Sequence, residues 1–416
     1  MATTDSRADI LVLSSAIGSG HMRASAALAL GVSLTDPART CSIVDFPHEV
    51  SPAIEDLLRR TYLESLKLMP DLYGKLYRMS ELRATQQSTP SRATELYERL
   101  QQFSEQWVAR QDPPRAQGAP QGARPQWRDA LAMRTLDRLV QSTGATALVA
   151  PHFYGASALG KYKDLHPDAF TGVVLTDYVP HPMGVPDNLD IYIVADDAAA
   201  ATVARTGVPE ERIYPTGIPI DPSFEEPADV PGVRTDVLNL SADGDDDLPI
   251  VSVMGGGLGG GHLESVVASL LEASAAMHLV VLCGSNTADR DRLRGIAAER
   301  GRSAIFLSFT DRVRDLMAAS QVLVTKPGGM SCTESLASGL PQVLFNPIPG
   351  QEEDNAAAMV RYGAGVMVDR TDDILGETMK ILTSQNYRRR MQESARAAHH
   401  PQSARTAAQL LLERMP

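Results

Sequence analysis

The stretch Lys326-Pro-Gly-Gly-Met-Ser-Cys-Thr-Glu334 decides the fold of the second half of this chain. It is followed by Gly339-Leu-Pro341 and by Pro349-Gly-Gln-Glu-Glu-Asp-Asn355. The pattern predicts a strand end, a glycine turn, a helix, a short strand and a second polar turn that opens another helix. Such alternation is typical of a parallel sheet that is covered by helices on both faces.

Two helix N-termini at one edge of this sheet predict the kind of ligand. The backbone N–H groups of a first helical turn lack partners within the helix and attract anions. A Glu or Gln in such a turn accepts hydroxyl groups, and Glu334 and Gln351 occupy these positions. Together they favour a ligand with phosphates and hydroxyls, as in a sugar nucleotide. The turn that opens the first of these helices contains Gly328, Gly329, Met330 and Ser331.

The composition limits the class of protein. The 416 residues suggest two or three domains, and 43% hydrophobic residues are enough to fill their cores. The 39 basic and 51 acidic residues give a net charge of -12, which argues against a nucleic-acid partner. Three well-separated cysteines are typical of a reducing compartment. Without a signal-peptide pattern or an apolar run of roughly 20 residues, we expect a cytoplasmic protein, with peripheral contact at the inner face of the plasma membrane as a further possibility.

Short apolar runs alternate with helical segments along the whole chain. In the first half we expect strands at residues 10–14, 42–45, 147–150, 172–176, 190–194 and 213–215, and helices at 21–30 and 54–68. In the second half we expect strands at residues 250–254, 279–283, 304–307, 322–325 and 342–345. Residues 112–124, rich in Pro, Gly, Gln and Ala, predict a loop.

A change in composition near the middle divides the chain. Prolines and the Ser-Ala-Asp-Gly-Asp-Asp-Asp run at residues 241–247 predict a linker. We therefore predict an α/β fold of two Rossmann-like domains whose parallel sheets face a central cleft. The first domain would cover residues 1–222 and the second 249–385, with the linker at 223–248. Helices at residues 386–416 would pack back toward the first domain.

The first candidate site is Gly18-Ser-Gly20-His21, which follows the first strand and opens a helix. Two glycines allow a sharp turn and a close approach of the backbone to a ligand. The helix dipole disfavours a charged imidazolium at this end, so a neutral His21 is a candidate general base for an attacking hydroxyl. A histidine that only caps the helix would occupy the same position. The sequence leaves both interpretations open.

The second candidate site is Gly255-Gly-Gly-Leu-Gly-Gly-Gly-His262, between a strand and a helix. Such a turn aims N–H groups and the helix dipole at phosphate oxygens. It is not a P-loop, because no Gly-Lys-Ser/Thr follows. A dinucleotide site is not favoured either, because the next strand ends in Cys283-Gly-Ser instead of an acidic residue. The alternative is a flexible tight turn.

Several motifs together resemble one family. They are Gly18 to His21, residues 62–77, Thr176-Asp-Tyr178, Thr216-Gly-Ile-Pro219, the glycine-rich loop and residues 326–355. In this combination the chain resembles, over about residues 8–370, glycosyltransferase family 28, which contains monogalactosyldiacylglycerol synthases and processive diacylglycerol glucosyltransferases. It is more distantly similar to the peptidoglycan lipid-intermediate N-acetylglucosaminyltransferase. The resemblance implies a GT-B fold and a UDP-sugar-dependent hexosyltransferase, with the acceptor on the first domain and the donor on the second.

The resemblance also implies roles for individual donor-side residues. The backbone of Phe309 and Thr310 would hold the uracil, and Glu334 would receive the ribose hydroxyls. Gln351, Glu352 and Asn355 would orient the hydroxyls of the donor sugar. For Glu334 and Glu352 the alternative is a solvated first-turn residue favoured by the helix dipole. The donor site would further include Gly20 and the diphosphate loop Gly256, Gly257, Leu258, Gly259 and Gly260.

On the acceptor side, Asp177 follows a buried strand beside Tyr178 and His181. It would orient His21 or assist the acceptor; a turn residue at a strand end is the alternative. In the lipid-glycosylating relatives a Trp stands three residues after the histidine of this motif, where this chain has Gly184. This departure makes a polar-lipid or natural-product acceptor as compatible with the motif as diacylglycerol.

An apolar segment at residues 53–77 is the other acceptor candidate. It would form an acceptor pocket or a patch that faces the membrane, and ordinary core packing is the alternative. Its aromatic members include Tyr62, Tyr73 and Tyr77.

The expected mechanism follows from these groups. No Asp-X-Asp follows a strand and no His/carboxylate cluster has metal spacing, so backbone donors would meet the charge of the leaving group. We expect metal-independent, inverting transfer with His21 as base and no cofactor beyond the UDP-sugar. Two other functions remain open: a non-hydrolysing UDP-N-acetylglucosamine 2-epimerase, and a non-catalytic partner of another transferase. Donor sugar, acceptor, number of sugars added and oligomeric state are not determined by the sequence.

Overall fold

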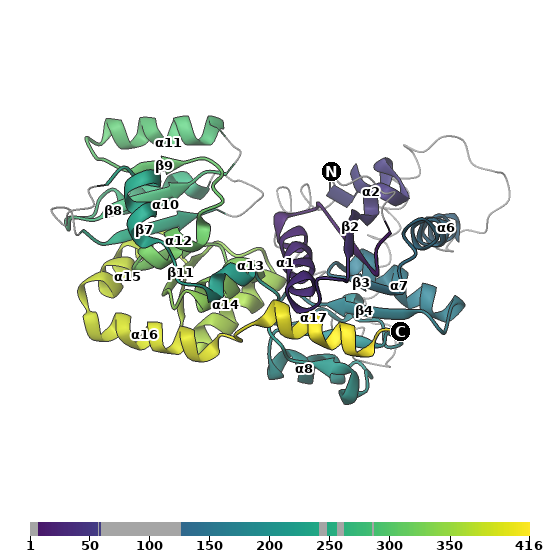
Figure 1. The fold of residues 1–416 in the computed structure, drawn as a ribbon. Coiled ribbons are helices and arrows are strands. Elements are labelled where there is room, and N and C mark those ends of the chain that lie inside the picture. The colour runs from purple at the N-terminus through teal and green to yellow at the C-terminus, as the bar shows by residue number, and fades with distance from the viewer. Residues whose placement is uncertain (1–6, 57, 60–125, 241–247, 256–261, 285–286) are drawn as a thin grey trace, which may run out of the picture.

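The computed structural model describes residues 7–56, 58–59, 126–240, 248–255, 262–284 and 287–416. It contains two six-stranded sheets, each the centre of one lobe (Figure 1). Every described strand pair in both sheets is parallel. The predicted α/β class is therefore confirmed.

The first sheet has the strand order β2-β1-β3-β4-β5-β6. The strands are β1 (Ile10–Ser14), β2 (Cys41–Asp45), β3 (Ala147–Ala150), β4 (Phe170–Val174), β5 (Ile191–Ile193) and β6 (Ile213–Tyr214). They lie within two residues of the predicted ranges, because β-branched and aliphatic runs buried on both faces leave little ambiguity. All residues of β1, β3, β4 and β5 are buried.

The second sheet has the order β12-β11-β10-β7-β8-β9. The strands are β7 (Ile250–Met254), β8 (His278–Leu282), β9 (Ile305–Leu307), β10 (Val322–Thr325), β11 (Gln342–Phe345) and β12 (Gly365–Val368). Counted from β9, the order is 3-2-1-4-5-6, the arrangement of a dinucleotide-type Rossmann sheet. The sequence did not predict β12, because Gly363 and Gly365 give its start the composition of a turn.

Helices cover both faces of each sheet (Figure 1). Around the first sheet they are α1 (Ser19–Thr35), α2 (Phe46–Val50), α6 (Gln126–Thr143), α7 (Phe153–Leu165), α8 (Asp197–Ala204), and the short 3-10 turns η1 (Pro182–Gly184), η2 (Glu210–Arg212) and η3 (Pro222–Glu225). Those that follow are α9 (Val230–Gly232), η4 (Val233–Val237), α10 (His262–Leu270), α11 (Thr287–Glu299), α12 (Val313–Ala319), α13 (Gly329–Ala337), α14 (Gln351–Tyr362), α15 (Thr371–Thr383), α16 (Gln385–Ala398) and α17 (Ser403–Arg414).

Part of the predicted linker is packed structure. Residues 230–237 form α9 and η4, and Val233 and Leu238 are buried in one cluster with Ile250 and Leu316 of the second lobe. Apolar residues three or four apart produce this contact, although prolines and acidic residues between them conceal the pattern in the sequence. Residues 241–247 lie outside the described residues.

The chain crosses between the lobes a second time after α16. Helix α16 packs on the second lobe, where Met391 belongs to the core, whereas α17 lies along α1 of the first lobe (Figure 1). Ala407, Ala408 and Leu411 are fully buried in the same cluster as the strands of the first sheet. The two helices are so close that a Cβ on Gly31 would lie 2.3 Å from the backbone oxygen of Ala404. The last helix therefore covers part of the first sheet and belongs to the core of the first lobe.

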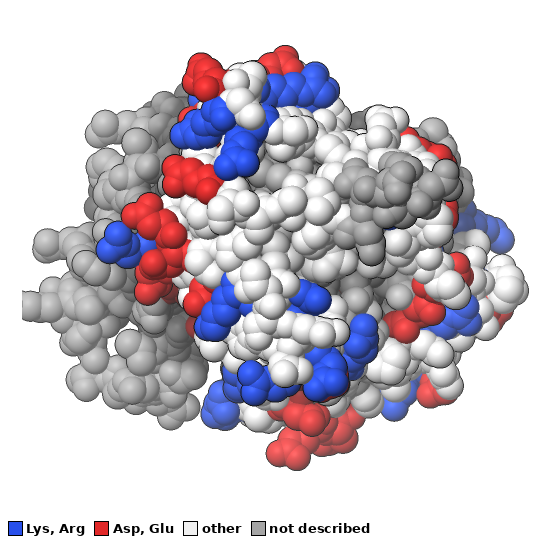
Figure 2. Space-filling model, turned by 90° about the vertical axis from the view of Figure 1, so that its left-hand side faces the viewer, with Lys and Arg blue, Asp and Glu red and all other residues white. Residues whose placement is uncertain are grey.

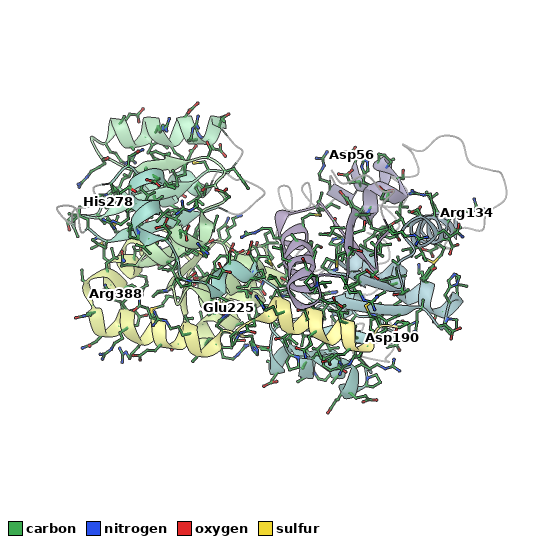
Figure 3. All side chains as sticks on the ribbon, viewed as in Figure 1. Asp56, Arg134, Asp190, Glu225, His278 and Arg388 are labelled. Carbon is green, nitrogen blue, oxygen red and sulfur yellow. The ribbon has the colours of Figure 1, made fainter. Side chains whose placement is uncertain are left out.

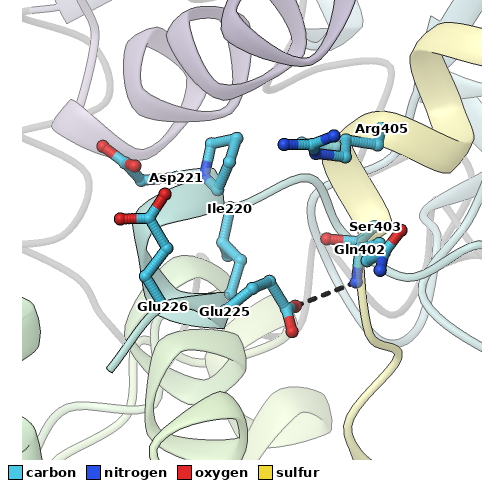
Figure 4. Close-up of a pocket in the computed structure, with 9 residues that line it drawn as sticks. Ile220, Asp221, Glu225, Glu226, Gln402, Ser403 and Arg405 are labelled. Atoms are coloured by element: carbon cyan, nitrogen blue, oxygen red, sulfur yellow. Dashed lines mark hydrogen bonds between the residues drawn. The ribbon is translucent and has the colours of Figure 1, made fainter. Parts of the chain in front are cut away.

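Glu225 joins the two crossings where the lobes meet (Figure 3). Its Oε1 accepts hydrogen bonds from the backbone N–H of Gln402 at 2.9 Å and from His399 Nε2 at 3.0 Å. Beside it lies a cavity of about 280 Å³, whose lining includes Asp221, Glu226 and Arg405 (Figure 4). Among the lining side chains, the Oγ of Ser403 is buried and has no hydrogen-bond partner from the residues that the structure describes.

Candidate active site

The two sheets each reverse their strand order at one point, and the candidate residues gather there. The first sheet reverses between β1 and β3, and the second between β7 and β10. Ligands of open α/β sheets bind in the crevice beyond the carboxyl ends of the strands at such points. Helix α1 follows β1, and α13 follows β10. A Cβ on Gly20 would lie 3.5 Å from Met330 Cγ, so these two helix N-termini face each other.

His21 is held by the neighbouring strand end. Its Nδ1 lies 3.0 Å from the carbonyl oxygen of Pro151 and 3.3 Å from Thr176 Oγ1. A carbonyl oxygen only accepts, so Nδ1 carries the hydrogen and Nε2 of the neutral ring is an acceptor. The N-cap of α1 is Gly18, without a side-chain cap, so the position of His21 is not explained by capping.

The surroundings of His21 keep its ring neutral. Burial lowers the pKa of His21 to about 4, while the hydrogen bond with Pro151 acts in the opposite direction. The ring of His152 lies edge-on, with centroids 4.7 Å apart, and burial lowers its pKa well below 6.5 as well. At neutral pH, the neutral ring of His21 therefore presents an acceptor lone pair on Nε2.

Asp177 does not orient His21, contrary to one of the two roles predicted for it. Its Oδ1 accepts a hydrogen bond from Asn355 Nδ2 at 3.0 Å, across the two lobes. Burial raises the pKa of Asp177 to about 6, with the charge of Asp354 as a further cause, while the bond from Asn355 lowers it. The groups that position His21 are instead the carbonyl of Pro151 and the hydroxyl of Thr176. These two residues follow β3 and β4, whose carboxyl ends lie beside the imidazole ring.

Asn355 and Tyr178 belong to the contact between the lobes. Asn355 is fully buried, and its Oδ1 accepts from the backbone N–H of Tyr178 at 2.8 Å. Only 4% of Tyr178 is exposed, and its hydroxyl lies 2.9 Å from Thr333 Oγ1. Tyr178 therefore offers no free acceptor surface here, and the amide oxygen of Asn355 is already used. Sequence patterns do not reveal such burial, because each residue meets a partner from the other lobe.

Glu334 is the buried carboxylate of the donor side. It is 1% exposed, and Oε1 forms an ion pair with Arg23 of α1. Its second oxygen, Oε2, is buried without a hydrogen-bond partner among the described residues. Burial raises the pKa of Glu334, and Arg23 opposes this shift. Arg23 was not predicted, because no motif links positions 311 residues apart.

Helix α14 begins with a cluster of acidic side chains. Glu352 Oε2 accepts from the backbone N–H of Ile348 at 2.7 Å, and Glu353 Oε2 accepts from that of Gly350 at 3.0 Å. Burial raises the pKa of Glu352, while Lys326 lowers it. Gln351 is half-buried at the start of the helix. Glu352 is therefore held against the turn that precedes its own helix.

The remaining donor-side candidates lie in turns of the second lobe. Phe309 is 83% exposed in the loop between β9 and α12, and Thr310 Oγ1 accepts from the backbone N–H of Arg312 at 3.1 Å. Gly329 opens α13, where a Cβ would lie only 1.9 Å from the Thr176 oxygen. Gly328 and Ser331 belong to the same turn. Gly256, Gly257, Leu258, Gly259 and Gly260 lie outside the described residues.

The acceptor candidates are only partly described. His181 is half-buried just before η1. Tyr62, Tyr73 and Tyr77 lie outside the described residues. In the described part of the chain, no helix has the length and apolarity needed to cross a membrane. Within the same part, no group of three or more His, Cys, Asp or Glu residues is placed to hold a metal ion.

Figure 2 shows acidic and basic side chains interspersed over the outer end of the second lobe.

Comparison with known proteins finds two family models, each of which matches part of the chain. Residues 250–411 match the glycosyltransferase family 28 C-terminal domain. Residues 126–220 match the monogalactosyldiacylglycerol (MGDG) synthase family. The resemblance seen in the sequence is thus confirmed.

One similar curated protein is the processive diacylglycerol beta-glucosyltransferase of Bacillus subtilis strain 168. It is 32% identical over 226 residues, which is 54% of this chain and 58% of that protein. The chain therefore spans less than two thirds of the length of this relative.

Two solved structures share the fold across both lobes. MurG of Acinetobacter baumannii has a TM-score of 0.59 at 12% identity, over 97% of this chain and 99% of that one. The UDP-GlcNAc 2-epimerase of Neisseria meningitidis, bound to UDP-GlcNAc, has a TM-score of 0.56 at 10% identity, over 97% and 99%. At these identities the likeness concerns the fold alone, and it confirms the predicted GT-B architecture.

Proposed function

We propose that this protein is an inverting glycosyltransferase that moves a sugar from a UDP-sugar to a hydroxyl group of a diacylglycerol-like lipid. The observation that carries this proposal is His21 at the switch point of the first sheet, whose acceptor nitrogen Nε2 has no hydrogen-bond partner among the described residues. The Bacillus subtilis relative, named a diacylglycerol glucosyltransferase, supports the acceptor class. A natural-product hydroxyl remains the alternative acceptor, because Gly184 stands where an aromatic residue would contact lipid.

The donor would bind against the second lobe. Glu334 Oε2, buried and unpartnered among the described residues, would accept the ribose hydroxyls. The turn at the exposed Phe309 and the half-buried Thr310 would hold the uracil through its backbone. The free N–H groups in the first turn of α13 would face the diphosphate, together with the positive end of the helix dipole.

The transfer is a single displacement at the anomeric carbon. His21 Nε2 takes the proton of the acceptor hydroxyl as its oxygen forms a bond to C1 of the sugar. The bond between C1 and the phosphate oxygen breaks on the opposite face, and UDP leaves with the electron pair. Attack from one face and departure from the other invert the configuration. In this proposal backbone N–H groups, and no metal ion, stabilise the charge on UDP.

The low pKa of His21 fits a base that works only with the donor in place. A base with a pKa of about 4 accepts a proton poorly by itself. Negative charge on the diphosphate would favour the imidazolium and raise this pKa toward neutrality. The enzyme would thereby restrict proton abstraction to the complex that holds the donor.

The test is a panel of UDP-sugars incubated with diacylglycerol, scored for UDP release and for product. We expect His21→Ala to lower kcat by about 10²- to 10⁴-fold while UDP affinity stays unchanged. The matched control is His48→Ala, which removes an exposed histidine paired with Glu55 in the same lobe. Full activity of His21→Ala would refute the mechanism. Isomerisation at C2 without UDP release would favour the epimerase function.

A further inference from the structure

The ion pair between Arg23 and Glu334 connects the two candidate sites. Arg23 stands two residues after His21 on α1, whereas Glu334 lies in α13 of the other lobe. The side chain of Arg23 is 39% exposed, but that of Glu334 is 1% exposed. A buried carboxylate depends on its single cationic partner far more than an exposed one does.

The two oxygens of Glu334 have different surroundings. Oε1 is taken by the Arg23 guanidinium, and Oε2 is buried with no hydrogen-bond partner among the described residues. The charged groups that face this carboxylate are Arg23 from α1 and Asp221 from the segment before η3. Asp221 and burial favour the protonated acid, so among the described residues Arg23 is the group that favours the carboxylate.

We propose that Arg23 is a positioning residue of the donor site, which holds Glu334 ionised and leaves Oε2 free to accept the ribose hydroxyls. The inference rests on the proposed function and adds a contribution from the first lobe to donor recognition. A neutral carboxylic acid would offer its carbonyl as a weak acceptor and its proton as a competing donor. Ribose is then recognised at full strength only while α1 and α13 stand together.

A second ion pair between the lobes shows why Arg23 differs from an ordinary interface contact. Arg361 lies 3.8 Å from Asp196, and 50% of its side chain is exposed. Asp196 has two further partners, the backbone N–H of Ala199 and the hydroxyl of Tyr362. Loss of Arg361 leaves this carboxylate satisfied, whereas loss of Arg23 leaves Glu334 buried without a side-chain partner in the described part of the chain. Arg361→Met is therefore the matched control.

The experiment measures the affinities of the full-length protein for UDP and for 2′-deoxyuridine diphosphate by calorimetry, between pH 6 and pH 8.5. The ratio of the two affinities isolates the ribose hydroxyl, because the titration of the diphosphate is the same in both ligands. For the wild type and Arg361→Met we expect a preference for UDP of about 10-fold or more that is flat with pH. Arg23→Met should lower the ratio below about 3-fold at pH 6, with recovery as rising pH ionises Glu334. Arg23→Lys, which keeps the positive charge, should retain a ratio that is flat with pH.

The outcomes separate this inference from the proposed function. A ratio for Arg23→Met that equals the wild-type ratio at every pH overturns the inference. So does an equal, pH-independent loss in Arg23→Met and Arg361→Met, because that result would assign Arg23 a purely structural role. If Arg23→Met fails to fold, a ratio for Arg23→Lys that has fallen to unity also overturns it. A wild-type protein that binds neither ligand would refute the proposed function itself.

Discussion

Replacing Asp177 by Asn should stabilise the protein at neutral pH and have little effect in acid. Burial raises the pKa of Asp177 from 3.8 to about 6 in the folded protein. The folded state therefore binds this proton more tightly than the unfolded chain does. Stability from the group is fully present below pH 3.8 and is lost as the pH rises through 6. Asparagine has the same shape, carries no charge and still accepts the hydrogen bond from Asn355.

The size of the effect follows from the shift. A difference between about 6 and 3.8, at about 1.36 kcal/mol per pKa unit, amounts to about 3 kcal/mol at pH 7.5. At pH 4 the same relation predicts that the substitution changes the free energy of unfolding by less than about 1 kcal/mol. For a lobe of this size, about 3 kcal/mol corresponds to an increase in Tm of roughly 6–12 °C.

The assay is thermal unfolding of wild type and Asp177→Asn at pH 4 and at pH 7.5. Asp168→Asn, which alters an exposed carboxylate of the same lobe, is the control and should change Tm little at either pH. A gain in Tm that is equal at both pH values would refute the reasoning, because its cause would not be ionisation. A loss of stability at pH 7.5 would show that the charge of Asp177 is needed to hold the lobes together.

Two further predictions concern the interface and the chemistry. Gly329→Ala should destabilise the protein by about 1–3 kcal/mol or more in thermal unfolding, because the added Cβ would lie 1.9 Å from the Thr176 oxygen. Gly376→Ala is the control: a Cβ at this position in α15 would meet open space, so the substitution should stabilise the protein slightly. A harmless Gly329→Ala would show that this contact yields easily. Glycosyl transfer should keep its full rate after exhaustive treatment with EDTA; a loss that Mg²⁺ or Mn²⁺ restores would assign a metal ion to the leaving group.

The sequence predicted what local patterns encode. Buried apolar runs of four or five residues located the strands of both sheets, and the glycine turns after the first and tenth strands marked the switch points. It did not predict β12, whose strand residues are few and follow two glycines. Nor did it predict the packing of residues 230–240, because prolines and acidic residues interrupt their apolar spacing.

Contacts between the lobes are the part that the sequence could not reveal. Asn355 was predicted to face the donor sugar, yet its amide joins Asp177, 178 residues away. Arg23 meets Glu334 over 311 residues. Such pairs depend on how the two lobes approach each other, which neither hydrophobic periodicity nor a short motif records. The sequence located the strand ends that carry the site but not the partner of each polar side chain.

The helix that completes the first sheet also sets an order of events during synthesis. Ala407, Ala408 and Leu411 cover strands, the last of which leaves the ribosome nearly 200 residues before α17. At roughly 5–20 residues per second, the nascent first lobe waits on the order of 10–40 s with this apolar surface uncovered. Chaperones that bind exposed apolar chain would have their longest access in that interval. A nonsense mutation between β6 and α17 would leave an early lobe in which every strand had been made but the helix that covers them was missing.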